Sequence, residues 1–227
     1  MTMRKLFLGT AVLMGAVATP AMAALIQTNG ISGTPLALTD AVGTTYATNT
    51  PVSYSAGTGL TASFTSPNKL ERDQAGGSYL DSNYATGTQL LLSCGFTSFS
   101  CVTPGNVTVT LSQGVGAFQF SVDDFDTSQA YTVSAQAFNG TTSLGTISVS
   151  VRADNAVAPG ILAATSTTPV TSVVLSSVPT AGGTGDGNFA IGNVSFVLPS
   201  STAVPEPASM ALLGAGLTGL SLVRRRR

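Results

Sequence analysis

Apolar and polar residues alternate strictly through much of the central part of the chain. The clearest alternation runs through residues 60–64, 107–111, 118–122, 131–137 and 147–151. A period of two residues with one polar face predicts half-buried antiparallel strands. Between residues 24 and 203 no stretch has the period of an amphipathic helix. The sequence therefore predicts an all-β domain.

Turn residues and changes of phase refine this prediction. Asn139-Gly140 lies between two alternating runs and predicts a type I′ turn that pairs residues 131–138 with 141–151. In the final run, apolar positions change phase at Gly192-Asn193, which predicts a β-bulge. Residues 155–168 and 179–188 have the composition of loops. Strands at this spacing predict an antiparallel β-sandwich, and a jelly roll is the expected arrangement.

The N-terminus has the three parts of a secretory signal peptide. Arg4 and Lys5 give a basic start, residues 6–17 are apolar, and Ala21-Met22-Ala23 forms a small-residue cleavage site. We therefore expect residues 1–23 to be a helical signal peptide that is removed on export.

The C-terminus consists of a short motif, an apolar run and a basic end. Pro205, Glu206 and Pro207 precede an apolar run over residues 208–223, and the chain ends in Arg224, Arg225, Arg226 and Arg227. A helix of this length reaches about 24 Å, which is short of the roughly 30 Å hydrocarbon core, so it spans with the help of snorkelling arginines. The four cations predict a transmembrane helix whose end stays in the cytoplasm, with the bulk of the chain outside.

These three C-terminal parts, in this order, resemble the PEP-CTERM sorting signal. Proteins of that family are exported by Gram-negative bacteria that make exopolysaccharide, and an exosortase, a membrane cysteine transpeptidase, is thought to read the signal and cut near it. With the features of the two ends and the alternating centre, the sequence divides into a signal peptide (1–23), a β-sandwich domain (24–199), a spacer (200–203) and a sorting signal (204–227). Residues 118–197 also resemble the sandwich domain common in this family, although relatives commonly carry Asp where this chain has Gly192.

The exported domain is acidic, because six of the nine basic residues lie in the two hydrophobic ends. Between residues 24 and 203, three basic residues face nine acidic ones. Such a surface lacks the electrostatic footprint of a nucleic-acid-binding protein. Direct contact with an anionic polysaccharide would need a bridging divalent cation.

Cys94 and Cys101 are the only cysteines, and in an oxidising compartment we expect them to form a disulfide. Closing so small a ring stabilises the fold by roughly 2.5 kcal/mol on the chain-entropy model. A zinc site is disfavoured because the chain has no histidine. A catalytic thiol pair would show a tighter spacing.

The acidic run Asp123, Asp124 and Asp126 follows a predicted strand, and its carboxylates could contribute ligands for calcium. The alternative is a solvated, turn-forming cluster, because calcium needs more oxygens than this stretch supplies. No other cofactor is expected.

Two further groups suggest contact with polysaccharide. Tyr79 and Tyr84 flank a polar loop and could stack on sugar rings, or they could instead cap the sandwich. Glu71, Arg72 and Asp73, after Lys69, form the one concentrated group of mixed charge in the exported domain; a glycosidase needs two carboxyls facing a sugar, and nothing in the sequence brings Glu71 near the other acids. The alternative for these acids is an exposed loop with local ion pairs.

Together these features predict an exported envelope or extracellular-matrix protein that is sorted by an exosortase and works through a non-enzymatic β-sandwich. We expect transient anchoring in the membrane, followed by a location at the cell surface or outside the cell. The expected partners are the secretion machinery, the exosortase and, in the alternative below, exopolysaccharide. That alternative is a carbohydrate-binding module, calcium-assisted or not, and a polysaccharide-acting enzyme is the third hypothesis.

Overall fold

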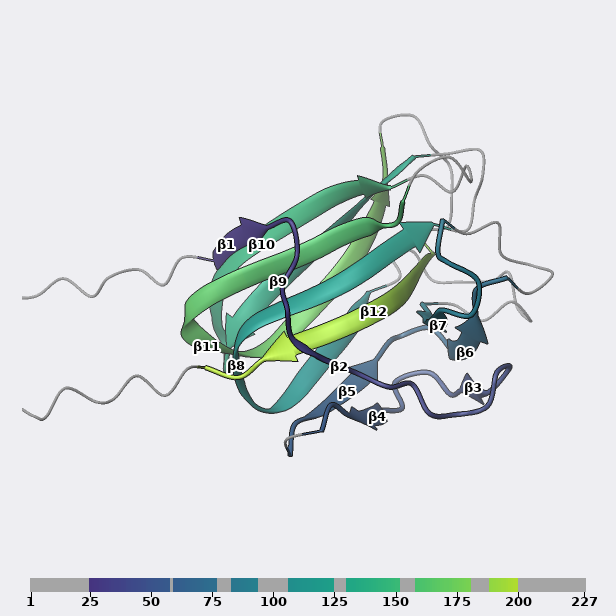
Figure 1. Cartoon of the computed structure of the whole chain (residues 1–227), viewed down its shortest axis with the longest axis horizontal. Helices are drawn as coiled ribbons and strands as arrows, with labels where there is room; N and C mark the ends of the chain where they lie inside the picture. The colour runs from purple at the N-terminus through teal and green to yellow at the C-terminus, as the bar shows by residue number, and fades with distance from the viewer. Residues whose placement is uncertain are drawn as a thin grey trace, which may run out of the picture.

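The computed structural model describes residues 25–57, 59–76, 83–93, 106–124, 130–151, 158–180 and 188–199. These residues are all-β, as predicted, and every pair of neighbouring strands is antiparallel (Figure 1). The strands are β1 (Leu25–Thr28), β2 (Thr34–Pro35), β3 (Thr45–Tyr46), β4 (Val52–Ser55), β5 (Thr61–Thr65), β6 (Leu70–Gln74), β7 (Gln89–Leu92), β8 (Val107–Asp124), β9 (Tyr131–Asn139), β10 (Thr142–Val151), β11 (Gly160–Pro179) and β12 (Phe189–Val197). Within these ranges no helix is long and apolar enough to cross a membrane. The expected signal helix and C-terminal helix lie outside the described residues.

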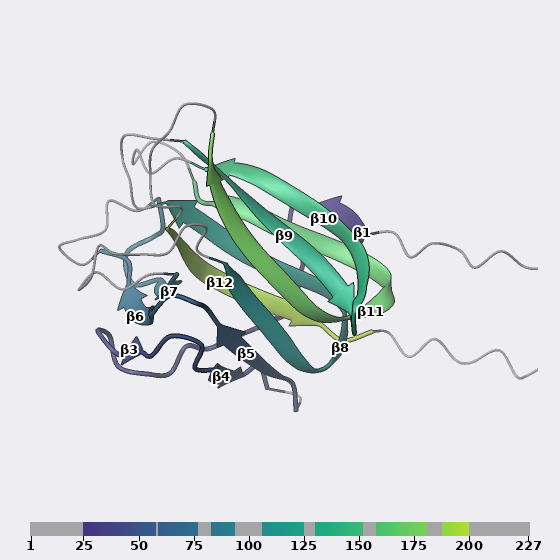
Figure 2. The same cartoon turned by 180° about the vertical axis from the view of Figure 1, so that it is seen from behind.

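Two long strands, β8 and β11, bend and take part in both layers of the fold. Their pairing is interrupted between Thr165 and Val170 on β11, where the register shifts. Beyond this bend, the second half of β11 and the first half of β8 form layer A with β4, β5, β9 and β10. The first half of β11 and the second half of β8 form layer B with β1, β12, β7, β6 and β3. The short strand β2 pairs with the end of β12. The result is one hydrogen-bonded sheet folded into a sandwich-like domain (Figures 1 and 2). The jelly-roll arrangement stays a prediction.

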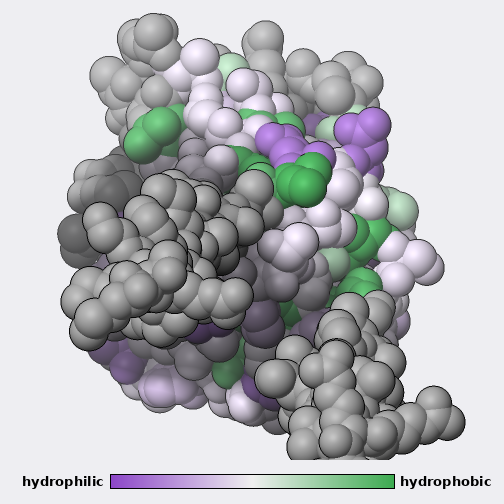
Figure 3. Space-filling view, turned by 90° about the vertical axis from the view of Figure 1, so that its left-hand side faces the viewer, coloured by the Kyte–Doolittle hydropathy of each residue, from purple (hydrophilic) through white to green (hydrophobic). Residues whose placement is uncertain are grey.

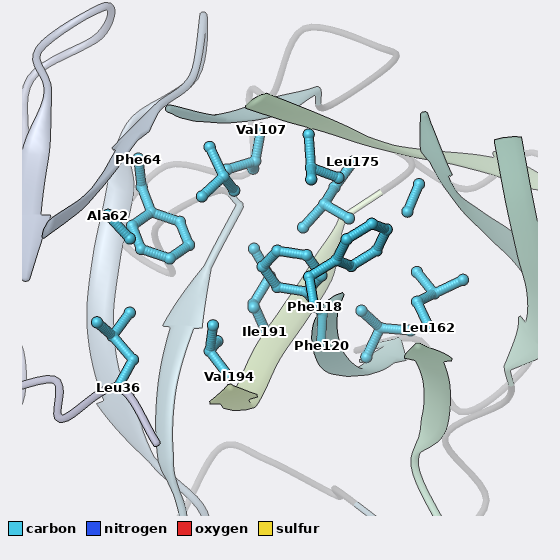
Figure 4. Close-up of a cluster of buried hydrophobic side chains, with 14 of the residues drawn as sticks. Leu36, Ala62, Phe64, Val107, Phe118, Phe120, Leu162, Leu175, Ile191 and Val194 are labelled. Carbon is cyan, nitrogen blue, oxygen red and sulfur yellow. The ribbon is translucent and has the colours of Figure 1, made fainter. Parts of the chain in front are cut away.

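The core lies between the two layers and is filled by the inward positions of the alternating strands. Phe64, Val107 and Leu175 come from layer A, and Phe118 and Phe120 come from layer B (Figure 4). The ring centroid of Phe120 lies 5.7 Å from that of Phe118 and 6.0 Å from that of Phe196. Alternation therefore identifies the core residues of the central strands correctly.

The predicted hairpin of β9 and β10 is confirmed, but its turn lies one residue further along. Asn139 pairs with Thr142, so Gly140 and Thr141 form the loop. Gly140 has a φ of 56°, while Asn139 does not have a positive φ. The Asn139 side chain instead donates its Nδ2–H to the carbonyl of Pro169 at 2.8 Å, which ties the hairpin to the bend in β11.

The predicted bulge in the last strand is also confirmed. Gly192 lies opposite Ser121 and Ser195 opposite Gln119, so β12 carries one residue more than β8 over this interval. Asn193 has a φ of 43°, a left-handed conformation that asparagine tolerates better than most residues. The bulge lets Ile191 and Val194 both face the core.

The prediction of a loop over residues 155–168 is wrong from Gly160 onward, because β11 begins there. Leu162, Ala163 and Ala164 are all completely buried. β11 is covered on both faces at this point, so its residues form a continuous apolar run instead of an alternating one.

The domain has two different ends. At the bend end, Leu25 pairs with Ser166 in the bend of β11, and Pro199 lies against Gly116 in the bend of β8. Both ends of the described chain therefore leave the domain here (Figures 1 and 2). At the opposite end, which we call the loop end, lie the strand termini Asp124, Tyr131, Val151, Pro179 and Phe189.

Candidate functional site

A buried polar cluster covers the outer side of layer B near the loop end. Asp123 of β8 is 1% exposed. Its Oδ2 accepts a hydrogen bond from the backbone N–H of Asn83 at 2.8 Å, and its Oδ1 accepts one from Asn83 Nδ2 at 3.2 Å. The carboxylate thus holds the segment that precedes β7 against the sheet.

Tyr84 lies beside this pair and packs into a second small core with Leu90, Leu92 and Ala190. Its hydroxyl donates to the carbonyl of Ser121 at 2.7 Å and lies 3.3 Å from the carbonyl of Ala190. Because the residue is only 6% exposed, its ring does not offer a face for stacking on a sugar. The structure thus contradicts the sugar-binding hypothesis for Tyr84, whereas Tyr79 lies outside the described residues.

Gly192 of β12 gives Tyr84 the space for this position. A Cβ atom at Gly192 would lie 2.8 Å from Tyr84 Cε1 and 2.9 Å from Leu90 Cδ2. The aspartate that the resemblance associates with this position therefore does not fit beside Tyr84 in this chain.

The calcium hypothesis stays a prediction. Asp123 bonds to Asn83, Asp124 ends β8, and Asp126 lies outside the described residues. No group of three acidic, histidine or cysteine residues suited to a metal ion is found in the part of the chain that the structure describes.

Glu71, Arg72 and Asp73 lie on strand β6, so the prediction of an exposed loop is wrong. Glu71 is 7% and Arg72 3% exposed. The Arg72 guanidinium donates to the carbonyls of Leu38 at 3.2 Å, of Leu90 at 3.4 Å, and of Asp73. Arg72 therefore joins the chain before β3 to strand β7, which is a structural role that local charge patterning does not reveal.

A second polar group, which sequence reasoning missed, joins β3, β4 and the preceding loop. The Tyr46 hydroxyl donates to Asp40 Oδ2 at 2.5 Å and lies 3.1 Å from the Tyr54 hydroxyl. Burial and the bond to Asp40 raise the pKa of Tyr46. Burial and the bond to Tyr46 raise the pKa of Tyr54. Alternation along β4 could have indicated that Tyr54 faces inward, but not which partner its hydroxyl meets.

The raised pKa values of these tyrosines and of Tyr84 predict that the domain loses stability in alkali. Burial, and then the negative charge of Asp123, raise the pKa of Tyr84 well above its ordinary value of 10.0. The unfolded chain loses this proton near pH 10, whereas the folded chain keeps it, so the free energy of unfolding should fall as the pH rises above about 10. Tyr84→Phe should reduce this fall by up to about 1.4 kcal/mol per pH unit, as measured by urea unfolding at several pH values. Ile147→Val is the control, since it removes one methylene group from the core side of layer A, away from Tyr84, and should lower stability equally at every pH. An unchanged slope in Tyr84→Phe would contradict the assignment.

The remaining predicted site residues lie outside the described residues. These are the cysteine pair, Cys94 and Cys101, the motif Pro205-Glu206-Pro207, and the arginines Arg224–Arg227. The disulfide therefore stays a prediction. The structure does place Pro199, the last described residue before the spacer, at the bend end.

The molecule is thus an all-β, sandwich-like domain whose final strand leads directly into an apolar, basic-ended tail. A family model for the PEP-CTERM protein-sorting motif matches residues 203–227, and the chain is accordingly a PEP-CTERM sorting domain-containing protein. No curated protein matches the chain. The motif implies recognition by an exosortase, export, and transient membrane anchoring at the C-terminus.

Proposed function

We propose that this protein is exported, anchored briefly by its tail and processed by an exosortase, and that its non-enzymatic β-domain then works at the cell surface or in the extracellular matrix. The observation that carries this proposal is the sorting motif at residues 203–227, which begins only a few residues after the domain ends. The position of Pro199 supports it. With the tail in the membrane, the bend end faces the bilayer and the loop end can face outward.

The C-terminal mass of the protein recovered from its native host tests this proposal. We expect the mature protein to lack Arg227 and the apolar run, because the tail serves only sorting. The triple change Pro205→Ala, Glu206→Ala and Pro207→Ala should leave the tail attached. Pro51→Ala, at an exposed position of the domain, is the control and should be processed normally. Recovery of the unchanged protein with Arg227 intact would overturn the proposal.

A second candidate function is binding of a neutral polysaccharide, and the outer face of layer A favours it. Small hydroxyl side chains lie side by side across the strands: Ser63 pairs with Thr110, which pairs with Ser172, and Thr65 pairs with Thr108. No charged residue occurs on the layer A strands, namely β4, β5, β9, β10 and the layer A halves of β8 and β11. Hydroxyl groups both donate and accept hydrogen bonds, so this face matches an uncharged, hydroxyl-rich polymer better than an acidic one.

An array of neutral and acidic glycans, probed with residues 24–203 with and without a chelator, tests this candidate. We expect retention on neutral glycans and loss of retention in Thr110→Asp, which places a charge in the middle of the hydroxyl rows. Thr141→Asp, in the β9–β10 turn, is the matched control. A loss of binding with chelator alone would favour the calcium-assisted form, and equal binding by Thr110→Asp and the unaltered domain would exclude this face.

A further inference from the structure

A hollow opens at the bend end, beside the point where the chain leaves the domain. Its volume is about 310 Å³, and it is lined by residues 32–34, Leu60 and residues 196–198. Ser32 and Thr34 are exposed, whereas Leu60 and Phe196 are buried. The hollow thus has an apolar floor and a rim of small polar residues.

The rim of the hollow is held firmly to the last strand. β2 pairs with β12 through Pro35 and Ser195, and the backbone N–H of Leu36 donates to the carbonyl of Val194 at 2.8 Å. A Cβ atom at Gly33 would lie 2.7 Å from the carbonyl oxygen of Phe196, so the two backbones are in direct contact there. The chain that carries the sorting signal therefore leaves from the edge of a fixed surface.

Among the residues that the structure describes, none at the bend end is charged. Within the described residues, the charged side chains belong to Asp40, Lys69, Glu71, Arg72, Asp73, Asp123 and Asp124, and none of these lies in the two bends, in the β9–β10 turn or around the hollow. Figure 3 looks onto this side of the molecule, where much of the surface has intermediate hydropathy and hydrophobic residues form small separate patches. Interface centres are likewise poor in charged residues, so this surface suits a partner that binds without ion pairs.

The sorting motif lies close to this surface. Six residue steps separate Pro199 from Pro205, and a fully extended chain spans at most about 3.6 Å per residue, which gives roughly 20 Å. The sequence predicts a helical tail, and an enzyme that encloses it must be wider than an α-helix, whose diameter is about 10–12 Å with side chains. Such an enzyme cannot reach the motif without coming close to the bend end.

We propose that the exosortase contacts the hollow beside β12 while it processes the tail, so that the folded domain forms part of the recognised substrate. This inference rests on the proposed function, because it concerns the same processing step. It goes beyond that function in assigning part of the recognition to residues 32–34 and 196–198, outside the sorting motif.

The test is the rate of tail loss in the native host, followed by pulse-chase labelling of the full-length chain. Ser32→Trp fills the hollow from an exposed position and should slow processing about fivefold to tenfold, the loss typical of one important interface position. Thr34→Glu provides a second variant that introduces charge instead of bulk. Ser150→Trp, at an exposed position towards the loop end, is the matched control and should be processed at the unaltered rate. Urea unfolding of each variant domain checks that the fold is retained.

A longer spacer separates contact with the domain from recognition of the tail. A flexible insertion of about twelve Gly and Ser residues after Pro199 should uncouple the two, so that Ser32→Trp no longer slows processing further. The inference is overturned if Ser32→Trp and Thr34→Glu are processed at the unaltered rate, or if they slow processing equally with the long spacer. Absence of tail loss in the unaltered chain would be a different result, which overturns the proposed function and this inference together.

Discussion

Replacement of Phe120 by alanine is expected to lower the free energy of unfolding by about 3–5 kcal/mol, the range found for Phe→Ala changes in protein cores. Phe120 is completely buried, and its ring packs against those of Phe118 and Phe196. Removal of the ring leaves a cavity that the neighbouring strands cannot easily close, because Phe120 pairs with Leu162 of β11, and the flanking Gln119 and Ser121 pair with β12. Urea unfolding of the isolated domain, residues 24–203, measures the change.

Two variants show whether this cost comes from the lost packing. Phe120→Leu keeps most of the apolar volume and should cost clearly less than Phe120→Ala. Ser150→Ala, on the exposed side of β10, should change stability by no more than about 0.5 kcal/mol. A cost below about 1 kcal/mol for Phe120→Ala would contradict the central position of this ring in the core.

Replacement of Arg72 by alanine is expected to lower the free energy of unfolding by about 3 kcal/mol, because buried carbonyls lose a charged donor. The guanidinium bonds to the carbonyls of Leu38, Leu90 and Asp73, and the residue is 3% exposed. The side chain thereby joins three stretches that are distant in the sequence. Thermal unfolding and urea unfolding should agree on the loss.

Neighbouring substitutions test the geometry behind this expectation. Arg72→Lys should recover little of the stability, since a lysine ammonium cannot reproduce the planar fork of donors. Lys69 lies immediately before β6 and is exposed, so Lys69→Ala removes a positive charge from the surface and should be nearly neutral. Similar losses for Lys69→Ala and Arg72→Ala would indicate a general charge effect instead of the three carbonyl bonds.

The sequence predicts the fold best where a strand has one buried and one exposed face. Val107, Val109, Phe118, Phe120 and the inward positions of β9 are found in the core as expected, because burial on one side produces strict alternation. The bulge at Asn193 was predictable for the same reason, since one extra residue reverses the phase. The sequence predicts the turn at Asn139-Gly140, one position before the loop of Gly140 and Thr141, and it does not reveal that the Asn139 side chain bonds to Pro169, a partner distant in the sequence.

Prediction fails where contacts distant in the sequence decide the structure. Residues 162–164 have no alternation because both of their faces are covered, and β1 to β3 are too short to show a period. The sequence also suggests that residues 107–111 and 118–122 are two separate strands, because the phase of the apolar positions changes within β8 at the bend. For the candidate sites, the sorting motif can be recognised from consecutive residues alone. The burial of Arg72 and Tyr84 depends on strands β6 and β7, which the sequence does not predict.

The bent strands have a mechanical consequence for a protein held by its C-terminus. A pull on Pro199 enters the domain through β12, and β12 pairs with β8 on both sides of the bulge at Asn193. Since β8 continues around the bend into the opposite layer, a load on β12 passes through β8 to both layers. A tethered copy in moving fluid should accordingly resist force until the whole domain gives way in one step.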